Sequence, residues 1–163
     1  MKAVLDSSAL LVGKYPDANE MLTTPEVVRE LKRKGMSPEL ESFVDIKVRI
    51  ASPSEEALRK VREASAESGD QERLSDTDKM LLALALDEKA TLFTDDYSIQ
   101  NLAKVLGLEY EGVMFPEITR KVSWRYRCQG CGKRFEDYSK TCPICGSDIR
   151  TYRETEEKIE KQK

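Results

Sequence analysis

Residues 90–107 read A-T-L-F-T-D-D-Y-S-I-Q-N-L-A-K-V-L-G, and this stretch decides the fold class. It begins with a short apolar run, Ala90–Thr94, of the kind that forms a buried strand. Two aspartates follow, and apolar residues then recur at helical spacing from Tyr97 to Leu106, where Gly107 ends the helix. A buried strand, an acidic turn and a helix together form part of a parallel α/β sheet.

The beginning of the chain has the same order of features. Lys2–Leu5 is a short apolar run that ends at Asp6, and it predicts the first strand. We expect Ser7 or Ser8 to cap a short helix over Ala9–Gly13. Two strands that each end in aspartate are therefore expected on either side of a long middle segment.

Serine, threonine and proline mark helix starts in that middle segment. The expected helices begin at Thr24-Pro25, at Ser37-Pro38, at a capping box from Ser52 to Glu55, and at Leu74–Asp78. Further strands are expected at Met21–Leu22, Ile46–Ile50 and Leu108–Met114, and a mobile polar loop at Ser68–Arg73. Alternating strands and helices predict an α/β fold with a mostly parallel central sheet.

Charge divides the chain into unequal parts. Residues 1–117 carry a net charge of −8, residues 118–153 carry +6, and residues 154–163 carry −1, which returns the total of −3. We expect an acidic domain over 1–117, a basic module over 118–153, and a polar C-terminal tail over 154–163 that is helical or disordered.

Composition excludes several classes of protein. The sequence contains no histidine, so a Ser-His-Asp triad, a Cys-His pair and an imidazole base are ruled out. Catalysis would have to use carboxylates, metal ions, Lys, Tyr or Cys. No stretch is apolar enough for a membrane span, and Asp6 interrupts the first apolar run where a signal peptide would not carry an acid. A cytoplasmic protein is expected.

Four cysteines lie within 18 residues, in the pattern C-x2-C-x10-C-x2-C. Two CxxC turns supply the four thiolates that tetrahedral zinc needs, and a module this small needs metal to fold. We expect one structural zinc ion; two disulfides and a rubredoxin-like iron site are the alternatives. The expected ligands are Cys128, Cys131, Cys142 and Cys145.

Basic residues and aromatics alternate around these cysteines. Such a mixture suits RNA, because phosphates pair with cations and bases stack on rings. The alternative is that the aromatics only pack beneath the ribbon. The candidate RNA-binding residues are Arg120, Lys121, Arg125, Arg127, Lys133, Arg134, Lys140, Arg150 and Arg153, with Trp124, Tyr126, Phe135 and Tyr152 among them.

Four acids in the N-terminal part are candidate catalytic metal ligands: Asp6, Glu30, Asp78 and Asp96. Ligand sites in parallel sheets form at the carboxyl ends of strands, where Asp6 and Asp96 would meet. Clustered carboxylates repel one another unless a cation lies between them, and Mg²⁺ or Mn²⁺ is the hard cation that suits oxygen ligands. Such a site can activate water and stabilise charge on a phosphoryl group.

Each acid also has a purely structural interpretation, as a helix cap or a surface ion pair. Asp6 and Asp96 could each cap a helix, and Asp78 could complete a capping box with Ser75. Glu30 could form an ion pair with Lys34. Asp76 and Asp95 are close enough in sequence to replace Asp78 and Asp96 as ligands.

The order of four segments resembles a PIN domain: V-L-D-S-S-A-L, P-E-V-V-R-E-L, L-S-D-T-D-K-M-L-L-A-L-A and L-F-T-D-D-Y-S-I-Q-N-L-A. With C-Q-G-C and C-P-I-C behind them, residues 1–153 resemble the archaeal Nob-type endoribonucleases of ribosome maturation. The resemblance implies a three-layer α/β/α fold and assigns the four family acids to Asp6, Glu30, Asp78 and Asp96. Ser7 or Ser8, and Thr94, match the family's hydroxyl residues.

The resemblance further implies a substrate and partners. These are single-stranded precursor RNA, cut at the 3′ end of small-subunit ribosomal RNA, and the assembling small ribosomal subunit. It implies Mn²⁺ or Mg²⁺ at the acids and zinc in the ribbon. Two alternatives stay open: a toxin-type PIN ribonuclease acting on transfer or messenger RNA, and a non-catalytic zinc-ribbon scaffold that binds RNA.

Overall fold

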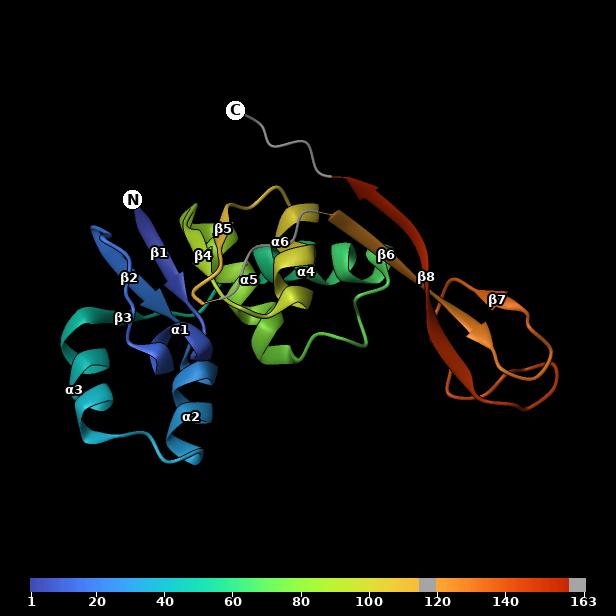
Figure 1. Cartoon of the computed structure of the whole chain (residues 1–163), viewed down its shortest axis with the longest axis horizontal. Helices are drawn as coiled ribbons and strands as arrows, with labels where there is room; N and C mark the ends of the chain where they lie inside the picture. Colours follow the sequence, from blue (N-terminus) through green and yellow to red (C-terminus); the bar gives the residue numbers. More distant parts are fainter. Residues whose placement is uncertain (115–119, 159–163) are drawn as a thin grey trace.

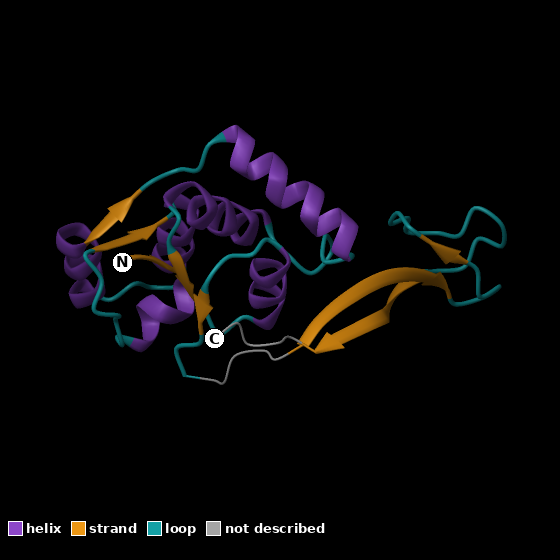
Figure 2. Ribbon diagram, turned by 90° about the horizontal axis from the view of Figure 1, so that it is seen from above, coloured by secondary structure: helices purple, strands orange, loops and turns teal. Residues whose placement is uncertain are grey.

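The computed structural model describes residues 1–114 and 120–158 (Figure 1). Five strands form one parallel sheet in the order β3-β2-β1-β4-β5. These are β1 Lys2–Leu5, β2 Glu20–Thr23, β3 Val48–Ile50, β4 Thr91–Phe93 and β5 Tyr110–Glu111. The helices that flank the sheet are α1 Ser7–Val12, α2 Pro25–Arg33, α3 Pro38–Lys47, α4 Glu55–Ser68, α5 Asp76–Glu88 and α6 Tyr97–Val105. The predicted α/β architecture with a parallel central sheet is confirmed, and Figure 2 shows helices on both sides of it.

Helix starts follow the predicted capping chemistry, with two corrections. Asp6, not Ser7 or Ser8, caps α1, because its carboxylate accepts the Ala9 N–H. The cap of α4 is Ser54, whose hydroxyl accepts the Ala57 N–H, so the capping box expected from Ser52 is wrong. Both errors arise because neighbouring Ser and Asp residues are equally good caps, and only the backbone path decides between them.

Two strand predictions were too long at their ends. The run Ile46–Ile50 alternates like a strand, but α3 continues to Lys47 and leaves Ile46 75% exposed. Buried Val44 and Val48 are four residues apart, a spacing that fits the end of a helix equally well. The last strand of the sheet is Tyr110–Glu111, shorter than Leu108–Met114, because β5 is an edge strand that pairs only with β4.

The core lies around the two central strands and α5. Ala3, Val4 and Leu5 of β1 are fully buried, as is Leu92 of β4. Burying a leucine or valine side chain stabilises the fold by about 1.5–3 kcal/mol, so β1 and β4 form a stable part of the core. Leu5 and Phe93 are paired at its carboxyl end, and the Asp6 N–H donates to the Phe93 carbonyl at 3.2 Å. The residues that follow β1 and β4 therefore begin side by side.

A second sheet, antiparallel in the order β7-β6-β8, forms the ribbon at the far end of the molecule (Figure 1). Its strands are β6 Arg120–Cys128, β7 Arg134–Phe135 and β8 Ile149–Lys158. Residues 154–158, expected in a helical or disordered tail, continue β8 alongside β6, with a one-residue register shift opposite Ser123 and Trp124. Their polar composition gave no sign of the partner strand that supplies their backbone hydrogen bonds. The predicted boundary after residue 117 and the tail beyond residue 158 lie outside the described residues.

Across the described parts of the chain, every helix is too short or too polar to cross a membrane.

Candidate functional site

A pocket of about 360 Å³ opens at the carboxyl edge of the parallel sheet. It is bordered by the starts of α1, α5 and α6 and by the middle of α2. All four predicted acids line it, although they are far apart in the sequence. The acidic residues of its lining are Asp6, Glu30, Asp78, Asp95 and Asp96. Of the two possible replacements, Asp95 lines the pocket and Asp76 is not part of its lining.

Asp6 is the most deeply placed of these acids, at 6% exposed. One carboxylate oxygen accepts the Ser8 hydroxyl at 2.6 Å and the Ala9 N–H at 3.0 Å, and the other accepts the Thr94 hydroxyl. These donors hold the carboxylate in one orientation at the end of β1. Desolvation by burial raises the pKa of Asp6, while the hydrogen bonds from Ser8 and Thr94 oppose that rise.

Two hydroxyl groups connect the acidic turns. Thr94 donates to Asp6 and accepts the Asp96 N–H at 3.1 Å. Ser8 donates to Asp6 and accepts the Asp95 N–H at 3.2 Å. Of the hydroxyl residues that match the family, Thr94 and Ser8 therefore lie where they can orient the site.

We expect Thr94→Val to lower the cleavage rate about 10- to 100-fold, the cost typical of losing a group that orients a metal ligand. Valine keeps the shape but removes both the donor to Asp6 and the acceptor for Asp96. Thr91→Val, at the start of β4 and also buried, is the matched control. Single-turnover cleavage measured over a range of Mn²⁺ concentrations checks this. Equal rates for both variants would contradict the orienting role.

Asp78 and Asp96 each serve as helix caps as well as lining the pocket. Asp78 completes the capping box of α5, because one of its oxygens accepts the Ser75 N–H at 2.9 Å. Asp96 caps α6, where one oxygen accepts the N–H groups of Ser98 and Ile99 at 2.8 and 3.3 Å. Each cap uses a single carboxylate oxygen. The structural and the functional interpretations of these two acids are therefore compatible.

Glu30 lines the pocket from α2, and its carboxylate is paired with a lysine side chain of the same helix. Its carboxylate forms the predicted ion pair with Lys34, one turn later, at 2.6 Å. The Glu30 side chain is 26% exposed and that of Lys34 is 59% exposed, so the pair lies in solvent and contributes at most about 1 kcal/mol. An ion in the pocket can compete with so weak an interaction.

The electrostatics of the pocket fit a divalent cation. Desolvation raises the pKa of Asp78, and the negative charges of Asp96 and Asp6 raise it further. A cation among these oxygens would remove that mutual repulsion, and all the donors are the hard oxygens that Mg²⁺ and Mn²⁺ prefer. The carboxylate oxygens do not yet converge: within the described part of the chain, only the four cysteines have ligand atoms all within 4.8 Å of one another.

Asp95 has a different function from its neighbour. Its carboxylate accepts the Val113 N–H at 2.7 Å and the Met114 N–H at 3.0 Å. These hydrogen bonds fasten the segment after β5 to the turn after β4. Asp95 thus both lines the pocket and binds the backbone after β5.

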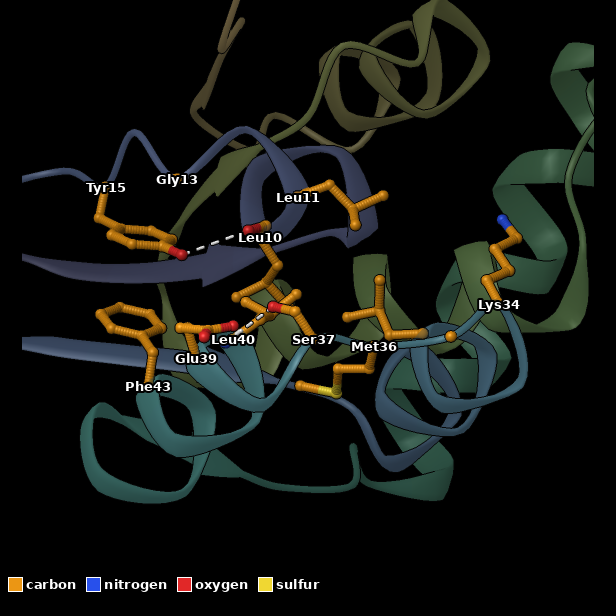
Figure 3. A pocket seen from close by; sticks show the side chains of 12 residues that line it. Leu10, Leu11, Gly13, Tyr15, Lys34, Met36, Ser37, Glu39, Leu40 and Phe43 are labelled. Atoms are coloured by element: carbon orange, nitrogen blue, oxygen red, sulfur yellow. Dashed lines mark hydrogen bonds between the residues drawn. The ribbon is translucent and has the colours of Figure 1, made fainter.

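A second hollow lies between α1, α2 and α3 (Figure 3). It is mainly apolar, with Leu10, Met36 and Leu40 on its walls and the stacked rings of Tyr15 and Phe43 at one end. Lys34 lines it as well. Glu39 is the one acid in its lining, so the hollow offers no cluster of metal ligands.

The four cysteines form a second candidate metal site. The Sγ atoms of Cys128 and Cys145 are 3.3 Å apart, and those of Cys131 and Cys142 are 3.7 Å apart. These separations are far beyond a disulfide bond and close to the edge of a zinc–sulfur tetrahedron. Hydrogen bonds from Ser147 lower the pKa of Cys145 to about 6, which favours the thiolate. The cluster can bind zinc, and the two-disulfide alternative does not fit.

The predicted RNA-binding residues divide into two groups. Arg127, Lys133, Arg134, Lys140 and Arg150 are exposed on the ribbon. Arg125 instead donates to the Glu67 carbonyl at 2.6 Å, and Trp124 lies beneath the Arg73 guanidinium. Tyr126 is buried against Tyr138, as the packing alternative expected. The side chains of Arg120, Lys121 and Arg153 lie outside the described part of the structure.

The burial of Asp70 was not predicted from the sequence. Asp70, in the segment expected to be a mobile polar loop, is fully buried and accepts hydrogen bonds from Ser68 and Asn101. Burial raises its pKa. An acid followed by polar residues gives no signal of burial, because its partners come from another helix.

Comparisons with known proteins show the family of the chain. A family model described as the PIN domain of ribonuclease matches residues 3–87. The chain is 40% identical over 153 residues to an endoribonuclease Nob1 of Pyrococcus abyssi, covering 92% of each, and 41% identical to that of Archaeoglobus fulgidus, covering 89% of this chain and 87% of the relative. It is 38% identical to a ribonuclease VapC1 of Thermoplasma acidophilum, covering 91% of this chain and 77% of the relative.

The fold is also found among solved structures. A VapBC2 structure from Rickettsia felis aligns with a TM-score of 0.50 at 21% identity and covers 69% of this chain and 98% of the other. At that identity the similarity concerns the fold alone. The relatives at about 40% identity extend over the acidic body and the ribbon together. The chain therefore belongs to the archaeal Nob1 endoribonucleases, which are PIN-domain nucleases.

Proposed function

We propose that the chain cuts single-stranded precursor RNA at the 3′ end of small-subunit ribosomal RNA, with its ribbon holding the RNA. The observation that carries the catalytic part is that Asp6, Glu30, Asp78 and Asp96 all line one pocket. The relatives' name supports endonucleolytic action on RNA. The choice of precursor is inferred from the family resemblance.

The donor set assigns the metal ligands. Asp6, Asp78 and Asp96 would hold Mn²⁺ or Mg²⁺, and Glu30 would complete the site directly or through water once it leaves Lys34. A bound ion of this kind activates water and offsets the charge of the phosphate. The four cysteines would hold one zinc ion.

The protein's own groups orient the reaction. Ser8 and Thr94 fix the Asp6 carboxylate, and Thr94 also holds the turn that carries Asp96. Helices α5 and α6 begin at the pocket, so their partial positive ends face it and favour both ionised carboxylates and a phosphate. Water adds to phosphorus as the P–O3′ bond breaks, which leaves a 3′-hydroxyl and a 5′-phosphate.

RNA binding and RNA cleavage are assigned to parts of the protein that carry opposite charge. The acidic pocket repels RNA, whereas the exposed cations of the ribbon attract it. Binding through phosphates releases counterions, so affinity should fall steeply as salt rises. We place this activity in the cytoplasm, on the assembling small ribosomal subunit.

The test is to map the RNA ends. Purified protein with Mn²⁺ is incubated with an RNA that spans the 3′ end of the small-subunit ribosomal RNA and its downstream precursor sequence. A single cut at the mature end, abolished in Asp6→Asn, is the expected result. Dispersed cutting of ribosomal, transfer and messenger RNA would favour the toxin-type activity that the similarity to a VapC1 ribonuclease raises. No cutting would favour a non-catalytic scaffold.

A further inference from the structure

The ribbon is fastened to the acidic body at a small joint, which we define as Gly69 and Arg73 of the α4–α5 loop together with Trp124 and Arg125 of β6. β6 runs alongside α4 and α6 and then extends into the ribbon (Figure 1). The joint therefore lies at the place where the acidic body and the basic arm meet.

Backbone contact at the joint is unusually close. Gly69 ends α4 with a φ of +80°, and a Cβ at this position would lie 1.6 Å from the Trp124 carbonyl oxygen. Only glycine allows both the left-handed conformation and this approach. Beside it, the Arg125 guanidinium donates to the Glu67 carbonyl at 2.6 Å, one of the carbonyls left without an intrahelical partner at the end of a helix.

A side-chain contact adds to this backbone contact. The guanidinium carbon of Arg73 lies 3.4 Å from the centre of the Trp124 ring, a cation–π arrangement. Trp124 is the only tryptophan in the chain. The ring is thus held between its own strand and a cation from the body, so this part of β6 is not a free tether.

The loop that carries Gly69 and Arg73 is itself fixed on the body. Asp70 is fully buried and accepts the Ser68 hydroxyl at 2.6 Å and the Asn101 amide at 2.9 Å, which ties the loop to α6. Two residues after Arg73, Ser75 caps α5 and binds Asp78 of the acidic pocket. One short segment therefore connects the joint to the pocket.

We propose that this joint sets the distance between RNA held on the ribbon and the phosphodiester in the acidic pocket, and thereby selects which bond is cut. The inference rests on the proposed function, since it needs RNA on both surfaces. Exposed cations on the ribbon bind the backbone without reading sequence. If the distance between the ribbon and the acidic pocket is fixed, RNA bound without sequence specificity is still cut at one position. If the ribbon moved freely, several neighbouring bonds could reach the acids.

The decisive variant is Arg73→Met, which keeps the length of the side chain and removes the cation over Trp124. Arg59→Met on α4 is the matched control, because Arg59 is exposed and forms an ion pair within its own helix, with Glu63. Arg73→Lys is the conservative rescue. Each protein is given an end-labelled single-stranded RNA long enough to span ribbon and pocket, and products are mapped to the nucleotide. A short oligonucleotide reports the chemical step alone.

We expect wild type, Arg59→Met and Arg73→Lys to cut one dominant bond. In Arg73→Met, cutting at neighbouring bonds should rise about two- to fivefold relative to the dominant one, the ratio that removal of an exposed cation–π interaction allows. Its rate on the short oligonucleotide should stay unchanged. Acrylamide quenching of Trp124 fluorescence should increase in Arg73→Met but not in Arg59→Met, which confirms that the joint has opened.

Two outcomes would count against the inference, and they are distinguishable. An unchanged cleavage pattern in Arg73→Met, with Trp124 more accessible to acrylamide, would show that the joint does not select the bond. Unchanged quenching would show that Arg73 does not hold the ring. If wild type itself cuts no RNA, the proposed function falls and takes this inference with it.

Discussion

Asp6→Asn should lower the rate of RNA cleavage by more than about 100-fold while leaving RNA affinity unchanged. Groups that merely orient a metal ligand cost about 10- to 100-fold, and a ligand itself should cost more. Asparagine keeps the size of the side chain and is also a good helix cap, so α1 should still begin at residue 6. The substitution removes one negative charge from the deepest point of the pocket.

Single-turnover cleavage and anisotropy of labelled RNA measure the two effects separately. Asp45→Asn, an exposed acid on α3 away from the pocket, is the matched control and should behave as wild type. Circular dichroism shows whether each variant is folded. A folded Asp6→Asn protein that loses RNA binding as well as cleavage would contradict the division between an acidic catalytic pocket and a basic RNA-binding ribbon.

Cys128→Ser, or removal of metal with a chelator, should unfold the ribbon and leave the α/β body folded. Metal binding in small cysteine modules supplies about 10–16 kcal/mol of folding free energy, and the hydrophobic cluster here is only Tyr126, Ile149 and two of the cysteines, with Phe135 packed against it. RNA affinity should fall. The slope of log affinity against log salt should decrease by about 0.7 for each phosphate of single-stranded RNA that the protein no longer binds.

Hydrogen exchange should show reduced protection in β6, β7 and β8 alone, and elemental analysis gives the zinc content per chain. Ser139→Ala, an exposed change within the same module, should keep both zinc and RNA affinity. Adding zinc back to the chelated protein should restore the affinity. Full RNA binding by metal-free protein would show that the folded ribbon is not the RNA-binding element.

Much of the fold could be predicted because local chemistry and packing agree. Thr24 and Ser75 are strong caps, and the apolar helix that follows Ser75 is buried as its composition indicates. The short runs that became β1 and β4 are mostly apolar, which suits strands with neighbours on both sides. By contrast, the boundary between α3 and β3 was wrong because Ile46 satisfies both periodicities, and only packing decides between them.

The candidate site was predictable for a different reason. Acids that follow buried parallel strands must meet at one edge, which places Asp6 and Asp96 without knowledge of the helices. Glu30 and Asp78 were candidates from their positions on helices, but their sequence surroundings equally favour an ion pair and a cap, and the family resemblance favoured the role as metal ligands. The structure shows those structural contacts and places both side chains at the pocket.

Contacts across the joint were beyond sequence reasoning because each needs two distant segments. Trp124 was a candidate for stacking on RNA bases, yet Arg73 occupies its face. Arg125 was a candidate phosphate ligand, yet its guanidinium binds a helix end. Residue type alone gives the possible partners of an aromatic ring or a guanidinium, and the fold decides which partner is present.

The close approach at Gly69 also limits how the two halves can be exchanged in engineering. A chimaera that transplants residues 120–158 onto a different nuclease body would inherit the zinc site and its cations. Without glycine at the recipient's equivalent position, the grafted strand would be pushed off the loop by the first side-chain carbon it met. Such a hybrid should bind RNA but cut it at several bonds. Transplanting position-specific cleavage therefore requires the recipient's loop to be replaced together with the ribbon.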